Sequence, residues 1–197
     1  MKTHIIIAIS YMIMALIPAA VIYAAIILIS TKLGKRKKVK KSKCIVEYLC
    51  LVYIWKILEI TGIIGMQFNL QWFKESVGSI GFYLPSGRGE WMMLLLNIGL
   101  FVPLGALIPF VFKLSPLKII LGIMFFSIAI EVLQMFSGRF FEINDILANT
   151  LGGVIGYGVY AIVNKKQGKA FNWRLFPVFS LYLFVLIIEW CVNKSKE

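Results

Sequence analysis

Three ionisable residues lie close together in the sequence, within or beside long apolar runs where a charged side chain has a high free-energy cost. Glu131 and Asp145 belong to long apolar runs, and Arg139 lies in the short connection between those runs. A charged side chain inside a membrane costs on the order of several kcal/mol unless it is paired, so each of the three requires a structural or functional reason. Buried carboxylates can act as general acid and base or bind a divalent ion, and the guanidinium fork suits carboxylates and phosphates. We expect Arg139 to pair with Glu131, Glu142 or Asp145.

Three amide side chains occur in the same kind of apolar run: Asn97, Gln134 and Asn149. Each of them, taken alone, is explained by a hydrogen bond between helices, which contributes about 1 kcal/mol to helix association. Hydrogen bonding between helices does not require three charged side chains at the same depth in the membrane. We therefore treat the charged residues and the amides together as the candidate site. The separate pair Lys56 and Glu59 is spaced i, i+3 and can simply neutralise itself.

The helical spacing of these residues indicates that they share faces. On one segment Ser127, Glu131 and Gln134 stand at i, i+4 and i+7, in one narrow stripe. On the next, Asp145 and Asn149 are four residues apart, which places them on one face as well. We expect both stripes to point into the bundle and not at lipid.

Two glycines continue the second stripe, and a third lies beside them. Gly152 and Gly156 form a small-xxx-small pair, and Gly153 adjoins the first of them. Such a pair lets another helix approach closely, so we predict helix packing at these positions.

The elements that must carry these residues are membrane helices. Of 197 residues, 60% are apolar, against about 45–50% in ordinary soluble domains. A membrane crossing needs about 20 helical residues. These runs are continuously apolar, without the alternation of barrel strands. The sequence predicts an all-α bundle of about six transmembrane helices, at Ile5–Ile29, Cys44–Gly65, Trp91–Phe112, Leu117–Phe136, Ile143–Val163 and Leu175–Val192.

Basic residues set the predicted orientation. They gather in the connections 32–43, 113–118 and 165–174, which alternate correctly with the spans and should face the cytoplasm. Both termini are then outside a plasma membrane, and the candidate site lies in its outer half. The net charge of +12 is confined to short stretches between apolar runs, which favours contact with membrane lipids and argues against a nucleic-acid partner.

The organisation we predict has three parts. Residues 1–43 form an anchor with a polybasic loop, residues 44–163 a four-helix core, and residues 164–197 a loop with a final span. Within the core, the outer connection 66–90 carries Leu70, Phe73, Val77 and Ile80 at helical spacing, which indicates a helix lying in the membrane interface.

The sequence gives no sign of a cofactor or metal. Its three cysteines show neither metal spacing nor a disulfide framework, and no phosphate-cradling loop is present. We therefore expect no cofactor and no metal site.

The polar motifs resemble those of the VanZ-like family. The series E-x-x-Q, R, D-x-x-x-N-x-x-G-G covers Glu131 to Gly153, and N-x-x-x-F-x-P-x-G begins at Asn97. The resemblance extends over roughly residues 45–163. It implies a role at the cell envelope, with reduced susceptibility to teicoplanin-type lipoglycopeptides in some members, and it implies these signature positions: Asn97, Glu131, Gln134, Arg139, Asp145 and Asn149.

Two functions of different classes remain open. In the first, the polar residues engage a lipid-linked cell-wall precursor or a lipoglycopeptide. In the second, Glu131 and Asp145 perform acid–base or metal chemistry on a lipid-linked substrate, as in an intramembrane enzyme. We favour the first, because no His or Cys partner and no serine nucleophile signature accompanies the acids. A small transporter is disfavoured because inverted repeats are not visible. The oligomeric state is left open.

Overall fold

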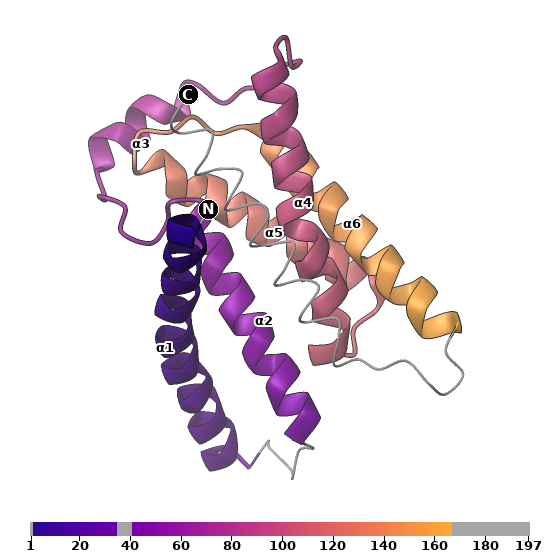
Figure 1. Ribbon diagram of the computed structural model, residues 1–197. Coiled ribbons are helices and arrows are strands. Elements are labelled where there is room, and N and C mark those ends of the chain that lie inside the picture. Colours follow the sequence, from indigo (N-terminus) through magenta and orange to yellow (C-terminus); the bar gives the residue numbers. More distant parts are fainter. Residues whose placement is uncertain (1, 35–40, 167–197) are drawn as a thin grey trace. The chain divides into compact units, whose positions relative to one another are not determined.

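The computed structural model describes residues 2–34 and 41–166 (Figure 1). Within those ranges the chain forms six α-helices and no strand, so the all-α prediction is confirmed. An isolated β-bridge joins Gly81 and Glu142. The helices are α1 Lys2–Lys32, α2 Lys41–Ile60, α3 Leu70–Val77, α4 Arg88–Val111, α5 Pro116–Met135 and α6 Ile143–Lys166.

Four of the described helices are long and apolar enough to cross a membrane, namely Ala15–Lys32 of α1, Arg88–Val111, Pro116–Met135 and Ile143–Lys165. The chain is accordingly a membrane protein. The predicted second span is present as a helix but ends at Ile60 instead of Gly65, and it is not among the four because of its charged side chains. The predicted sixth span, Leu175–Val192, lies outside the described residues. The number six therefore stays a prediction.

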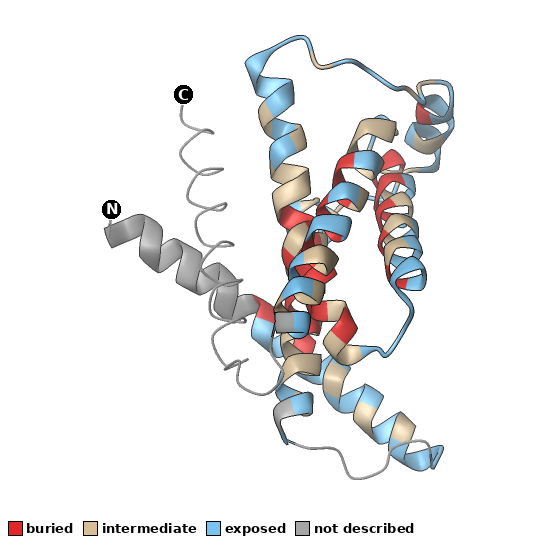
Figure 2. Cartoon of the chain, turned by 90° about the vertical axis from the view of Figure 1, so that its right-hand side faces the viewer, coloured by how far each residue is buried: buried red, intermediate tan, exposed pale blue. Residues whose placement is uncertain are grey.

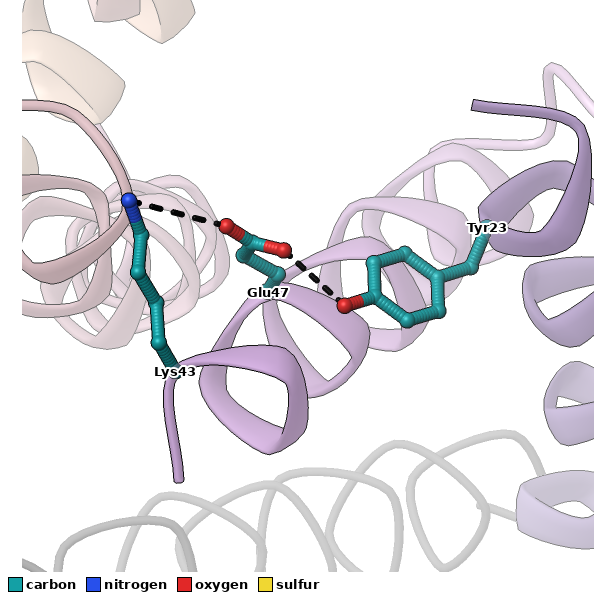
Figure 3. A network of polar contacts seen from close by, with 3 residues as sticks. All are labelled: Tyr23, Lys43 and Glu47. Atoms are coloured by element: carbon teal, nitrogen blue, oxygen red, sulfur yellow. Dashed lines mark hydrogen bonds and ion pairs between the residues drawn. The ribbon is translucent and has the colours of Figure 1, made fainter. Parts of the chain in front are cut away.

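The described chain divides into two compact units, and the division falls inside α2, between Trp55 and Lys56. In the first unit, Ala15 and Ala19 of α1 pack on Val52 of α2. Polar contacts join the same helices: the Tyr23 hydroxyl donates to Glu47 Oε2 at 2.9 Å, and Lys43 Nζ lies 3.8 Å from the other carboxylate oxygen (Figure 3).

In the second unit, α6 packs against both α4 and α5. Most large apolar side chains of the core come from α4 and α5, and Figure 2 shows buried stretches, in red, along the helices of the chain. The most deeply buried large apolar side chains are Ile57 of α2, Phe101 and Leu104 of α4, and Ile119, Ile123 and Ile130 of α5.

A helix is present in the connection 66–90, as predicted, and this helix, α3, packs across the end of α5. Asn69 caps it, because its side-chain oxygen accepts from the Gln71 N–H at 2.8 Å. The helix ends at Val77, so Ile80, which we expected to continue it, lies beyond its last turn. Phe73 stacks on Phe136 with ring centroids 4.3 Å apart.

Candidate functional site

Glu131 joins the end of α5 to the beginning of α6. Its side chain is buried, and Oε2 accepts a hydrogen bond from the backbone N–H of Glu142 at 3.0 Å. Glu142 directly precedes α6, where the first N–H groups of a helix have no partner within it. A carboxylate is favoured there by the helix dipole as well. Glu131 therefore orients α6 relative to α5.

Asp145 brings a second carboxyl and a third helix to the same place. It occupies the first turn of α6, and its side chain lies beside Asn97 of α4. Glu131 is close enough to Asp145 and to Glu142 for their charges to interact. Three acidic side chains therefore gather where α4, α5 and α6 meet at one end of the bundle.

Arg139 does not form the ion pair that we expected. Within the described residues it has no salt bridge to Glu131, Glu142 or Asp145, although its charge acts on two of them. Instead its Nη1 donates to the backbone carbonyl of Thr61 at 3.0 Å. The guanidinium is exposed.

The end of α2 explains why this carbonyl is available. Gly62, with φ +77°, allows the chain to turn, and the Gly62 and Ile63 N–H groups donate back to Glu59 and Leu58. This is the glycine-terminated helix end known as a Schellman motif. The Thr61 carbonyl, at the negative end of the helix dipole, accepts from Arg139 and also from Gln134 Nε2 at 2.8 Å.

A second polar layer lies one helical turn deeper. Asn149 Nδ2 donates to Ser127 Oγ at 2.8 Å, and both side chains are buried. Asn149 Oδ1 and Thr150 Oγ1 are buried without a partner among the described residues. Ser127 precedes Glu131 by four residues and Asn149 follows Asp145 by four, so the two layers stand on the same faces of α5 and α6.

Glycines bring α4 and α6 into backbone contact below these layers. A Cβ at Gly152 would overlap the Ile98 carbonyl, and one at Gly156 would overlap the Val102 carbonyl. Gly105 faces Gly153 in the same way, so glycine occurs on both sides of the crossing. This close approach carries Asn97 of α4 to Asp145.

The connection that contains α3 closes this end of the unit. The N–H of Gly81 donates to the Phe141 carbonyl at 3.2 Å, and the N–H of Ile143 donates to the Gly81 carbonyl at 3.1 Å. The Asn144 amide pairs with both backbone groups of Tyr83, accepting from its N–H and donating to its carbonyl. The Asn144 side chain therefore adds a further pair of hydrogen bonds beside the β-bridge between Gly81 and Glu142.

We call the seven residues near this end the polar cluster: Asn97, Ser127, Glu131, Gln134, Arg139, Asp145 and Asn149. The structure brings Glu131, Asp145, Asn97 and Arg139 to one end of the bundle, and it places Asn149 with Ser127 in the deeper layer. Among the described residues no group of three His, Cys, Asp or Glu side chains could hold a metal ion.

Two participants were missed by sequence reasoning. Thr61 acts through a backbone carbonyl, which has no side-chain signature, although the following glycine marks the helix end. Asn144 acts by pairing with a segment 61 residues away. An Asn next to the start of a helix is a signal for a local cap, and it does not indicate this remote partner.

The comparisons with known proteins agree with one another. The family model VanZ/LLP1 matches residues 11–164. Protein VanZ of Enterococcus faecium is 24% identical over 150 residues, which make up 75% of this chain and 90% of the relative. No solved structure matches the chain. Because the family model spans well over half of the sequence, the chain belongs to the VanZ/LLP1 family.

Proposed function

We propose that this protein lowers the susceptibility of a bacterial cell to teicoplanin-type lipoglycopeptides. The polar cluster would engage a lipid-linked cell-wall precursor or the lipidated antibiotic itself, on the outer side of the plasma membrane. Membership in the VanZ/LLP1 family and the similarity to Protein VanZ support the proposal. So does the predicted orientation, which puts the cluster on the side where such ligands are found.

The observation that carries the proposal is the state of Arg139. Its guanidinium is exposed and donates through Nη1 to the neutral carbonyl of Thr61. Its positive charge is therefore not neutralised by a carboxylate. The remaining N–H groups find no acceptor among the described residues. An arginine in this state can hold a phosphate or carboxylate of an amphiphilic ligand in a bidentate manner.

The test measures glycopeptide susceptibility in a susceptible host that expresses the chain. Arg139→Lys keeps the positive charge but loses the fork, so we expect it to remove most of the protection, as loss of one charge-assisted hydrogen bond costs about 1.5–3 kcal/mol of binding. Membrane abundance should stay unchanged. Lys118→Arg, an exposed cation at the opposite end of α5, is the matched control. Full protection by the Arg139→Lys protein at normal abundance would remove the main support for ligand binding.

A second candidate, an intramembrane enzyme, is favoured by one observation. Glu131 accepts from the N–H of Glu142, which directly precedes α6, and Asp145 lies in the first turn of that helix, so the two carboxyls are neighbours that could divide the roles of acid and base. Lipid extracts of expressing cells, compared by mass spectrometry with extracts of Glu131→Gln cells, distinguish the two. An altered lipid that depends on Glu131 indicates catalysis. Protection that depends on Glu131 with identical extracts indicates binding.

A further inference from the structure

Arg139 of the polar cluster and the nearby Glu142 are two exposed opposite charges that do not pair. Arg139 and Glu142 are three residues apart, and both are exposed. Arg139 is held by the Thr61 carbonyl at 3.0 Å, and the Glu142 side chain makes no hydrogen bond or ion pair with the described residues. Neighbouring opposite charges that stay separate can both be neutralised by a ligand that contains both signs.

The position of these charges relative to the spans limits what that ligand is. Helix α5 is 20 residues long, about 30 Å, which matches the hydrocarbon thickness of a bilayer. Its last residue is Met135, so Arg139 and Glu142 follow directly after the span, at the depth of lipid head groups.

Apolar side chains of the α3 connection lie at the same level. The Trp72 indole lies near Gly138, the neighbour of Arg139, because a Cβ added at Gly138 would be in van der Waals contact with the ring, and Trp72 remains 38% exposed. Leu70 and Val77 on the same helix are exposed as well. Exposed apolar residues and tryptophan beside charged groups are typical of a surface that lies at the boundary between head groups and acyl chains.

We propose that this surface binds an aminophospholipid of the surrounding bilayer, with phosphatidylethanolamine as the chemical type. The lipid phosphate pairs with Arg139, the primary ammonium pairs with Glu142, and the acyl chains lie against Trp72 and its apolar neighbours. The exposed Glu142 carboxylate repels a purely anionic head group and attracts an ammonium, so it favours the ammonium-bearing lipid. The inference rests on the proposed function for the location of the site and names the ligand chemistry more closely.

The experiment uses the full chain in phosphatidylcholine nanodiscs, so it does not depend on antibiotic susceptibility. Each disc contains a minor share of brominated phosphatidylethanolamine or brominated phosphatidylglycerol. The quenching of Trp72 fluorescence is obtained as the difference in fluorescence quenching between the unmodified protein and the Trp72→Phe protein. We expect phosphatidylethanolamine to be enriched about fivefold at Trp72, the effect of roughly one charged contact at a membrane surface, and phosphatidylglycerol not to be enriched.

Variants then test whether each of the two charged residues contributes to lipid binding. Arg139→Gln and Glu142→Gln should each reduce the enrichment to the background, whereas Lys118→Gln, at the opposite end of α5, should leave it unchanged. Equal quenching by both lipids in the unmodified protein overturns the proposal even if a variant fails to fold. So does displacement of the lipid by soluble phosphoethanolamine at millimolar concentration, because the surface would then take a free solute. Loss of protection against lipoglycopeptides plays no part in these readouts, so either proposal can fail alone.

Discussion

At the scale of single residues, most buried polar side chains in the described part of the chain are held by hydrogen bonds and not by ion pairs. Glu131 accepts from a backbone N–H, Gln134 donates to the Thr61 carbonyl, and Asn149 donates to Ser127. The Lys56–Glu59 pair is an exception, with Nζ and Oε2 2.8 Å apart. A backbone partner neutralises less charge than an ion of opposite sign, so the positive charge of the exposed Arg139, which donates to the Thr61 carbonyl, is not neutralised by an ion pair.

The Ser127–Asn149 hydrogen bond should stabilise the bundle in a way that depends on both partners. Ser127→Ala leaves the Asn149 amide buried without an acceptor, so we expect it to lower the free energy of unfolding by about 1–3 kcal/mol. The double variant Ser127→Ala with Asn149→Leu removes both polar groups and should cost less than the sum of the single changes. Unfolding in detergent micelles measures the cycle. Strict additivity would show that the two side chains do not interact.

At the scale of elements, α6 is the helix around which the second unit is built. Its glycine face lies on the backbone of α4, and its first turn receives Glu131 from α5 and pairs with the α3 connection. Each contact places a different part of the polar cluster. Shifting α6 by a fraction of a turn would therefore separate Asp145 from Asn97.

Alanine should have opposite effects at two glycines of α6. In a helix interior, Gly→Ala normally stabilises by about 0.5–1 kcal/mol. At Gly158, where nothing lies within 4 Å of an added Cβ, we expect that normal effect. At Gly152 the same methyl group would overlap the Ile98 carbonyl, so we expect loss of stability and a lower yield of folded protein. Thermal unfolding in micelles compares the two. A Gly152→Ala protein as stable as Gly158→Ala would mean that α4 and α6 are further apart than described.

The Asn144 amide should hold the α3 connection in place. Asn144→Ala removes both of its hydrogen bonds to Tyr83, so local opening of the connection becomes easier. We expect faster trypsin cleavage after Lys74, which is exposed on α3. Asn164→Ala, an exposed asparagine near the other end of α6, is the control. An unchanged cleavage rate in the Asn144 variant would mean that other contacts, for example the β-bridge at Gly81, hold the α3 connection in place.

At the scale of the whole molecule, the arrangement of basic residues predicts which way the bundle is inserted. The connections on either side of α4 should lie on opposite sides of the membrane. Ser86 precedes α4 and Ser115 follows it, and both are exposed. The predicted orientation puts Ser86 outside, on the side of the polar cluster.

Cysteine labelling in intact cells tests this orientation. In a background whose native cysteines are replaced, Ser86→Cys should react with a membrane-impermeant thiol reagent, and Ser115→Cys should react only after the cells are opened. The reverse pattern would put the polar cluster on the cytoplasmic side. The proposed engagement of an external lipoglycopeptide would then be wrong.

The sequence by itself determined the class of fold and the positions where polar residues meet. Apolar length predicts helices α4, α5 and α6, because a bilayer demands about 20 apolar residues per crossing. Helical spacing puts Ser127 with Glu131 and Asp145 with Asn149, because 3.6 residues per turn is a property of the backbone. The tertiary structure alone decided the partners. Arg139 binds a carbonyl at the end of α2, and Asn144 binds a backbone segment 61 residues away, because backbone groups are alike at every position and leave no trace in the sequence.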